Sequence, residues 1–184
     1  MKESYLFLAD GFEEIEALAT VDVLRRANVN VTVVSIYEHD TVNGAHGIGV
    51  VADEVFSECE FDNADWLILP GGLPGADNLV AYKPLAELLK KHYKAGGRIA
   101  AICASPGVVL APLGIVNGKN ATVYPGFESK LEAGGAHPTG ERVTVDGNVT
   151  TGNGPASAVP FALKIVEQTV GKEVADQVAS GMLC

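Results

Sequence analysis

The amino-acid sequence predicts an α/β fold whose central sheet is mostly parallel and is covered by helices on both faces. Strand and helix patterns alternate along the whole chain, and parallel neighbours need crossover connections, which are usually helices. No internal repeat, low-complexity stretch or linker interrupts this alternation. Because 184 residues are enough for one well-buried core and few for two, we expect residues 1–184 to form a single domain.

The N-terminal half is predicted from short apolar runs, which indicate buried strands, and from amphipathic spacing, which indicates helices. Pro70-Gly71-Gly72 ends one strand, and Gly96 ends the helix that follows it. The expected elements are a strand over 4–9, a helix over Glu13–Ala27, a strand over Val29–Tyr37, a turn and a strand over Gly44–Asp53, a strand over Trp66–Leu69 and a helix over Pro84–Lys94.

The C-terminal half follows the same rules. Asp146-Gly147 is a favoured hairpin turn, and Gly171 separates two helical patterns. The expected elements are a strand over 98–102, a helix over Pro106–Leu113, a loop at Tyr124-Pro125, a short helix over Phe127–Glu132, strands over Arg142–Val145 and Asn148–Thr151, and helices over Ala156–Val170 and Lys172–Ala179.

Cys103 stands where a predicted strand ends and a helix begins at Pro106 with no loop between them. The chain must reverse sharply there, and the small residues Ala101 and Ser105 leave room for the reversal, as in a nucleophile elbow. We expect Ser105 to cap the helix, and we expect the amides at the helix start to favour the thiolate of Cys103. An inert buried thiol is the alternative, but the elbow spacing favours a reactive residue.

Glu16 is the second candidate residue. On a helix that starts near Glu13 it shares an apolar face with Ala19 and Val23, and this face should pack on the sheet. An unpaired carboxylate is costly there, so Glu16 must find a partner or keep its proton. Glu13 and Glu14 are interpreted as solvated acidic residues that complement the helix dipole, and the same interpretation is the alternative for Glu16.

Gly71 and Gly72 follow a predicted strand, so their backbone N–H groups can approach an anion without interference from a Cβ atom. Together with the N–H of Ala104 they are expected to form an oxyanion hole beside Cys103. A plain tight turn is the alternative interpretation.

The composition excludes several classes of function. With 47% hydrophobic and 20% charged residues the chain resembles an ordinary folded protein, and its formal net charge of −10 leaves no basic stripe for nucleic acid or an anionic membrane. The apolar run from Tyr5 to Ala9 is too short for a signal peptide or a membrane span. Cys59, Cys103 and Cys184 lack the spacing of a zinc or dithiol site, which fits a reducing, cytoplasmic location.

The histidines do not indicate a metal site. His39, His46, His92 and His137 are not spaced as metal ligands are. We therefore expect neither a metal nor another cofactor.

Four ordered segments resemble the DJ-1 branch of the ThiJ/PfpI superfamily, and the resemblance runs nearly end to end. The segments are Gly11–Glu16, Leu69–Gly72, Ala100–Ala104, and Gly152–Pro155 followed by Phe161–Leu163. The resemblance implies a flavodoxin-like three-layer sandwich, a homodimer and an oxidation-prone elbow cysteine, here Cys103. It also implies that Glu16 is protonated and donates a hydrogen bond to that cysteine.

The chain departs from the family pattern around the cysteine. Ala104 follows Cys103 where protease-like branches place a histidine, and Tyr124 stands where many DJ-1 relatives have one. His46 and Asn153 replace two anion-binding arginines of animal relatives. The resemblance makes His46, Tyr124 and Asn153 expected pocket residues, His46 approaching from the partner subunit's side. No general base is evident beside Cys103, although nucleophilic catalysis usually needs one.

The resemblance implies a cysteine-dependent stress-response protein that acts on reactive aldehydes, with glyoxalase-like or deglycase-like activity. On this hypothesis the Cys103 thiolate attacks the aldehyde and Glu16 moves a proton. The alternative is a non-catalytic redox sensor or chaperone, in which peroxide oxidises Cys103 to a sulfinic acid. A binding domain without turnover, an intracellular protease and a role in thiamine-precursor synthesis are weaker alternatives. The expected partners are a small reactive carbonyl compound or peroxide and a second copy of the chain.

Overall fold

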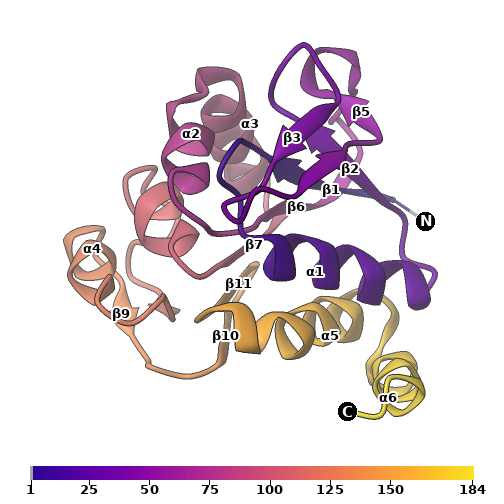
Figure 1. Ribbon diagram of the computed structural model, residues 1–184. Coiled ribbons are helices and arrows are strands. Elements are labelled where there is room, and N and C mark those ends of the chain that lie inside the picture. Colours follow the sequence, from indigo (N-terminus) through magenta and orange to yellow (C-terminus); the bar gives the residue numbers. More distant parts are fainter. Residues whose placement is uncertain (1) are drawn as a thin grey trace.

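A seven-stranded sheet forms the centre of the computed structural model, which describes residues 2–184 (Figure 1). The strand order is β10-β11-β7-β6-β1-β2-β5, and all neighbours run parallel except β10 and β11. The predicted α/β class with a mostly parallel sheet is therefore confirmed. The strands are β1 (Glu3–Leu8), β2 (Val31–Ser35), β5 (Glu54–Val55), β6 (Ala64–Leu69), β7 (Arg98–Ile102), β10 (Val143–Asp146) and β11 (Val149–Gly152).

Helices cover both faces of this sheet and give three layers (Figure 1). One face carries α1 (Glu14–Arg26), α5 (Ala158–Val170) and α6 (Lys172–Gly181), and the other carries α2 (Gly75–Ala81), α3 (Lys83–Lys94) and η2 (Pro106–Leu110). No helix within residues 2–184 has the length and apolar character needed to cross a bilayer. The remaining helical segments are α4 (Glu128–Ala133), η1 (Phe56–Glu58) and η3 (Pro155–Ser157).

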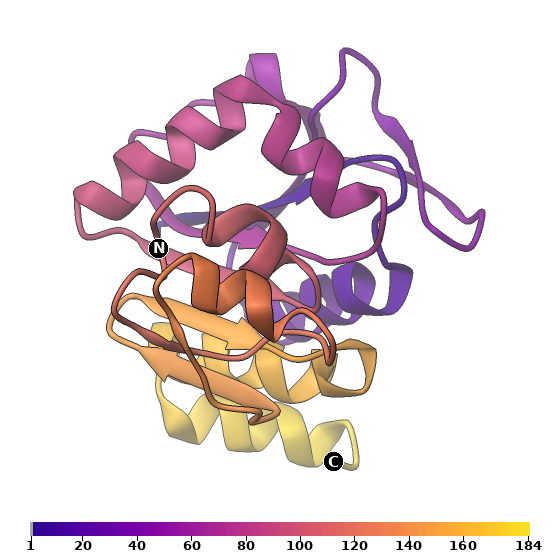
Figure 2. The same ribbon diagram turned by 90° about the vertical axis from the view of Figure 1, so that its left-hand side faces the viewer.

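Two short strand pairs lie outside the main sheet. Strands β3 (Thr41–Asn43) and β4 (Gly49–Val51) form an antiparallel hairpin, and β8 (Asn120–Ala121) pairs in parallel with β9 (His137–Pro138). The β3–β4 hairpin, in purple, projects from the body of the molecule (Figure 2).

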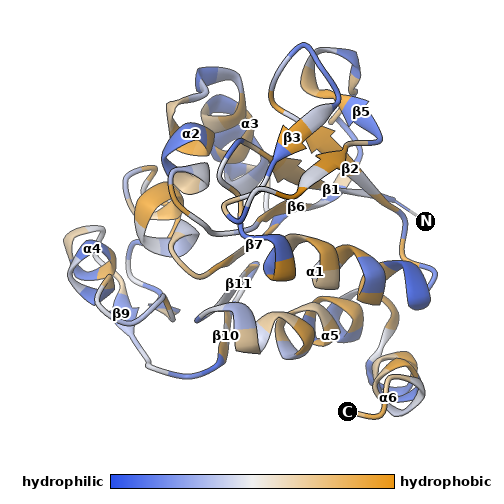
Figure 3. Cartoon of the chain, in the orientation of Figure 1, coloured by the Kyte–Doolittle hydropathy of each residue, from blue (hydrophilic) through white to orange (hydrophobic). Residues whose placement is uncertain are grey.

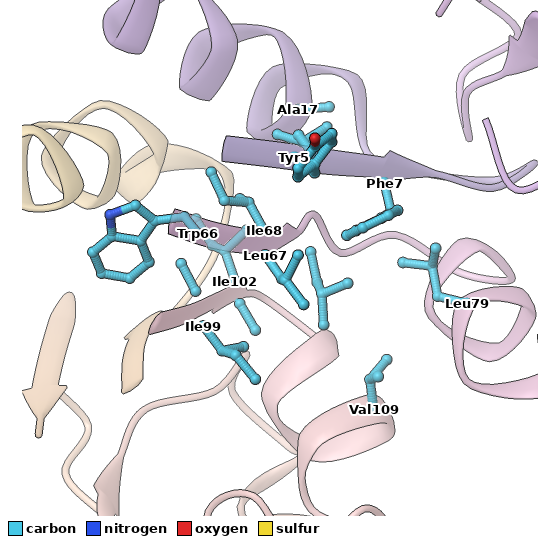
Figure 4. Close-up of a cluster of buried hydrophobic side chains, with 14 of the residues drawn as sticks. Tyr5, Phe7, Ala17, Trp66, Leu67, Ile68, Leu79, Ile99, Ile102 and Val109 are labelled. Atoms are coloured by element: carbon cyan, nitrogen blue, oxygen red, sulfur yellow. The ribbon is translucent and has the colours of Figure 1, made fainter. Parts of the chain in front are cut away.

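The core lies on both sides of the central strands β1, β6 and β7. Because both faces are covered, these strands are apolar without interruption over most of their length. Figure 4 shows Trp66, Leu67 and Ile68 of β6 beside Ile99 and Ile102 of β7. Helices α1 and α5 carry both hydrophobic and hydrophilic residues, as the mixed colours of Figure 3 show. The same packing brings the C-terminal ends of β1, β6 and β7 to one edge of the sheet.

The structure corrects three of the predicted elements. Helix α2 was not predicted, because Gly75, Asp77 and Asn78 are weak helix formers. The helix predicted over Pro106–Leu113 is only a π-helical turn that ends at Leu110. The turn and strand predicted over 44–53, interpreted as a small hairpin at a sheet edge, do form part of a hairpin, β3–β4, but this hairpin is separate from the main sheet. The predicted hairpin at Asp146-Gly147 is confirmed as β10–β11.

Candidate active site

Cys103 lies directly after β7 with a φ of +63°, a conformation that non-glycine residues rarely adopt. Its neighbours hold it there. The Cys103 N–H donates to the Gly152 carbonyl at 2.9 Å, and the Tyr124 N–H donates to the Cys103 carbonyl at 2.8 Å. A strained residue persists only where surrounding structure fixes it, and these two bonds fix the elbow from both sides.

Gly71 lies so close to the elbow that only glycine fits. A Cβ atom at this position would lie 2.5 Å from Cys103 Cβ, 2.7 Å from Glu16 Oε2 and 3.0 Å from the Ile102 carbonyl oxygen. The backbone after β6 therefore packs closely against both the Cys103 side chain and the Glu16 carboxyl group.

Glu16 is fully buried on α1, although it is an acidic residue. Its Oε2 accepts the Gly71 N–H at 2.8 Å. Its Oε1 is buried without a hydrogen-bond partner among residues 2–184, and the carboxyl group interacts with the Cys103 thiol. A protonated carboxyl has one hydrogen to donate, and the sulfur of Cys103 is the acceptor at hand.

The surroundings of Glu16 favour its neutral form. Burial raises the pKa of the Glu16 carboxyl to about 7, and the nearby charge of Glu13 adds to this effect. The interaction with Cys103 and the Gly71 amide act in the opposite direction and lower this pKa. The carboxyl group therefore gains and loses its proton near neutral pH.

The prediction that the elbow lowers the pKa of Cys103 is wrong. Burial, followed by the charge and hydrogen bond of Glu16, raises the pKa of the Cys103 thiol to about 12. The N–H groups of Gly72 and Ala104 donate to the sulfur and lower this pKa, but they do not outweigh the other effects. The expectation of a lower pKa took account of the amides at the helix start, but not of burial or of the charge of Glu16.

Cys103 and Glu16 are best described as a pair that shares protons. The ionised Glu16 opposes a thiolate, but a protonated Glu16 carries no charge and can donate to it. Loss of one proton from the pair therefore leaves either a carboxylate beside a thiol or a thiolate beside a carboxylic acid. The second form is a nucleophile with a proton donor in contact.

Two further expectations about the elbow are corrected. The Gly71 amide does not serve as an oxyanion donor, because it is engaged by Glu16 Oε2, which leaves Gly72 and Ala104 as the amides at the sulfur. Ser105 does not cap the helix, because its hydroxyl donates to the Pro70 carbonyl at 2.5 Å. That bond ties the start of η2 to the end of β6.

Glu13 and Glu14 are not solvated, contrary to the prediction, since they are only 8% and 5% exposed. Glu13 is the N-cap of α1, and its Oε2 accepts the Glu16 N–H at 2.8 Å. The spacing of Glu13 and Glu16 is that of a capping box, in which the cap residue bonds the N–H three positions later. This spacing was the available sequence signal for Glu13.

Tyr124 and Asn153 lie on the two loops that anchor the backbone of Cys103. The Tyr124 side chain is 44% exposed, and its ring lies over Gly154, where an added Cβ would be 3.3 Å from the ring. The Asn153 Oδ1 accepts the Ser157 hydroxyl at 2.6 Å. The backbone therefore places both residues beside the elbow.

His46 contacts Glu14 and not Cys103 within one chain. Its N–H donates to Glu14 Oε1 and its Nδ1 lies 2.7 Å from Glu14 Oε2. The His46 side chain is 69% exposed, which leaves its outer edge open to solvent or a partner. Ligand atoms of Glu13, Glu14 and His46 lie within 4.8 Å of one another, but both Glu14 oxygens already accept His46 groups and Glu13 caps α1.

Comparison with known proteins gives a consistent result. The model of the DJ-1/PfpI family matches residues 2–168. The chain is 41% identical over 176 residues to "Protein DJ-1 homolog A" of Arabidopsis thaliana, covering 96% of the chain and 45% of that relative. It spans a similar share, 41%, of a second Arabidopsis relative, so it is less than half as long as these two proteins.

Two further relatives match over most of their own length. The chain is 38% identical over 161 residues to "Glutathione-independent glyoxalase DJR-1.2" of Caenorhabditis elegans, covering 88% of the chain and 84% of the relative. Among solved structures, "Toxoplasma gondii DJ-1, oxidized" has a TM-score of 0.94 at 38% identity and covers 100% of the chain and 98% of its own.

Proposed function

Because the chain belongs to the DJ-1/PfpI family, we propose that it is a stress-response protein that converts small 2-oxoaldehydes to 2-hydroxy acids at Cys103 and Glu16. One observation carries this proposal. A buried carboxyl oxygen without another partner in residues 2–184 adjoins a thiol on a strained elbow. A relative named as a glutathione-independent glyoxalase supports the same reaction class.

In the proposed reaction the Cys103 thiolate attacks the aldehyde carbon and forms a C–S bond. The carbonyl electron pair moves to oxygen, and Glu16 gives its proton to that oxyanion, which yields a hemithioacetal. The Gly72 and Ala104 amides, which donate to the sulfur in the free protein, supply hydrogen bonds beside the developing charge. Glu16 leaves this step as a carboxylate and can therefore act as a base.

The carboxylate of Glu16 then takes the proton from the carbon that carries the sulfur and returns it to the neighbouring carbon. The hydroxyl proton of the hemithioacetal passes to the former ketone oxygen, so that a C=O bond forms at the carbon that carries the sulfur and the neighbouring carbon becomes the alcohol. The product is a thioester of a 2-hydroxy acid, which water hydrolyses to free Cys103 and the acid. The sequence consumes one water and needs no external oxidant or reductant. Since a pKa of about 7 lets Glu16 both donate and accept protons near neutral pH, it can fill the role for which the sequence offered no histidine.

Lactate formation from methylglyoxal tests this proposal. We expect Cys103→Ala and Glu16→Gln each to lower the rate by about 100-fold or more, because one removes the nucleophile and the other the transferable proton. Cys59→Ala is the control and should keep the wild-type rate. Equal rates in wild type, Cys103→Ala and Glu16→Gln would eliminate the proposed enzyme.

A second function is favoured by the donors around the sulfur. If peroxide oxidises Cys103 to a sulfinate, the Gly72 and Ala104 amides and the proton of Glu16 are positioned to bond the new oxygens. The solved relative from Toxoplasma gondii is titled as an oxidised form. We propose redox sensing as the alternative use of this site, with a partner or client protein that responds to the oxidised surface.

We also propose that residues 1–184 act as one domain, as a homodimer and in the cytoplasm. Exposed apolar side chains support the dimer, since Ile15 and Leu18 on α1 and Ile48 and Val51 around the β3–β4 hairpin are each 42–68% exposed. The Glu14–His46 contact joins these two elements. Clusters of this kind are typical of interaction surfaces.

A further inference from the structure

Three hydrogen bonds form a closed ring behind the candidate site. The Glu13 N–H donates to the Gly71 carbonyl at 2.9 Å. The Gly71 N–H donates to Glu16 Oε2 at 2.8 Å, and the Glu16 N–H donates to Glu13 Oε2 at 2.8 Å. Each of the three residues therefore both donates to and accepts from the ring, and the Glu16 carboxyl cannot move without disturbing it.

The ring also places two acidic side chains in one buried region. Glu13 is 8% exposed and Glu16 is fully buried. The Glu13 side chain is fixed at the N-terminus of α1, because its Oε2 accepts the Glu16 N–H. A negative charge on Glu13 opposes a second negative charge on Glu16, so the arrangement favours one carboxylate and one carboxylic acid.

We propose that Glu13 is a positioning residue, which holds the Glu16 carboxyl against Cys103 through the ring and uses its own charge to keep Glu16 protonated. The inference deepens the proposed function and rests on the roles proposed there for Cys103 and Glu16. Glu13 does not touch the thiol or a substrate and acts only through Glu16. Its direction of effect on the pKa of Glu16, which is upward, agrees with this role.

The other charged groups around Glu13 define the control. Glu14 and His46 are its charged neighbours, from α1 and from the turn of the β3–β4 hairpin. Both Glu14 oxygens are occupied by His46, and Glu14 makes no hydrogen bond to Glu16 or Gly71 among residues 2–184. Glu14 thus has the same chemistry, a similar burial and an adjacent position, but it lies outside the ring.

The charge of Glu13 should also affect the thiol of Cys103. When Glu16 is protonated, loss of a proton from the pair can produce the Cys103 thiolate, whereas an ionised Glu16 opposes it. Removing the charge of Glu13 should therefore lower the pKa of Glu16 and reduce the fraction of thiolate near neutral pH. A residue that only stabilised the helix would leave this titration unchanged.

The test compares Glu13→Gln with Glu14→Gln in the full chain. Glutamine keeps an oxygen that can cap α1 but carries no charge. The pKa of Glu16 is followed by ¹³C NMR of its carboxyl carbon, assigned by its loss in Glu16→Gln, and the thiolate is followed by alkylation of Cys103 with iodoacetamide at pH 7. In Glu13→Gln we expect a lower pKa of Glu16 and alkylation slower by about three- to tenfold, and in Glu14→Gln we expect the wild-type values of both.

An unchanged Glu16 titration in folded Glu13→Gln would overturn the proposal, and so would an equal change in both variants. If Glu13→Gln does not fold, Glu13→Ser decides, because serine is a favoured N-cap and also lacks the charge. Neither readout requires turnover. If the proposed function is wrong, the protein forms no lactate, but Glu13→Gln still lowers the pKa of Glu16. If this inference is wrong, the protein forms lactate, but Glu13→Gln leaves the pKa of Glu16 unchanged.

Discussion

Cys103 and Cys59 are two shielded thiols of the same chain, and burial raises the pKa of both, to about 12 and about 11. Their partners differ. Cys103 receives the N–H groups of Gly72 and Ala104 and adjoins a carboxyl that can remain neutral. Burial alone therefore does not distinguish the two sites.

The surroundings of Cys59 contain acceptors and negative charge. Its thiol donates to the Val55 carbonyl at 3.5 Å, and the carboxylates of Glu54 and Glu58 further raise its pKa. A thiolate at this position would face three groups that repel it. Hydrogen-bond donors and a shareable proton, rather than low exposure, therefore distinguish Cys103 from Cys59.

The largest effect is expected from Gly71→Ala, which should make Cys103 as unreactive as Cys59. The new Cβ would meet backbone and Cβ atoms that cannot turn aside, at 2.5 Å from Cys103 Cβ. We expect a loss of about 1–3 kcal/mol in the free energy of unfolding, measured by urea denaturation, and alkylation of Cys103 as slow as that of Cys59.

Gly181→Ala is the matched control for this substitution. An added Cβ at Gly181 in α6 meets no atom within 4 Å, so stability should be unchanged or slightly higher. If Gly71→Ala is as stable and as reactive as wild type, the close approach of β6 to the elbow does not create the special character of Cys103.

The next effect concerns oxidation. Mild peroxide should add two oxygens to Cys103 at least about tenfold faster than to Cys59, because the thiolate is the species oxidised and only Cys103 has donors that stabilise it. Mass spectrometry of cysteine-containing peptides measures both rates in one sample. Equal oxidation of both residues and of Cys184 would remove the basis for a redox sensor.

Much of this comparison could be predicted from the sequence. The elbow followed from small residues around Cys103 between a strand pattern and a helix pattern, and Glu16 followed from its place on an apolar helix face. Both are local features, and the strands around them were predictable for the same reason. Helix α2 was missed because its glycine and its polar residues are weak local signals, and it forms only where the loop containing Gly11 packs against Gly75.

The parts that could not be predicted depend on contacts between distant segments. Glu14 is buried because His46, 32 positions later, supplies two hydrogen bonds to it. The Gly71 amide serves Glu16 rather than an oxyanion because of where the ends of α1 and β6 meet in space. The rise in the pKa of Cys103 comes first from burial and then from the carboxyl group of Glu16, which is distant in sequence.

The pH dependence of alkylation should also differ between Cys103 and Cys59. The rate at Cys103 should rise first near pH 7, where the pair loses one proton, and again at much higher pH. The rate at Cys59 should rise in a single step near pH 11. Glu16→Gln should abolish the step near pH 7 at Cys103 and leave the profile of Cys59 unchanged. A single step at Cys103 in wild type would contradict the shared proton.

The smallest effect is expected at His46, whose side chain contacts Glu14 and should influence stability only within one chain. A hydrogen bond to Glu14 raises the pKa of His46, so its contribution is complete below pH 6.5 and is lost as the pH rises through the higher folded value. Burial acts to raise the pKa of Glu14, but the hydrogen bonds from His46 outweigh burial, so the pKa of Glu14 is lowered. The stability that Glu14 contributes is therefore present above pH 4.5 and is lost as the pH falls through its folded pKa. The pair should therefore stabilise the hairpin most between about pH 4.5 and 6.5.

His46→Gln should accordingly lower the free energy of unfolding more at pH 5.5 than at pH 9, as measured by urea denaturation at the two values. Glu14→Gln should remove the same pH dependence, because it removes the other half of the pair. Alkylation of Cys103 should stay at the wild-type rate in the isolated His46→Gln subunit, since His46 and the thiol share no contact within one chain. A slower rate that appears only at concentrations where the protein dimerises would instead show that His46 reaches the thiol of the second copy.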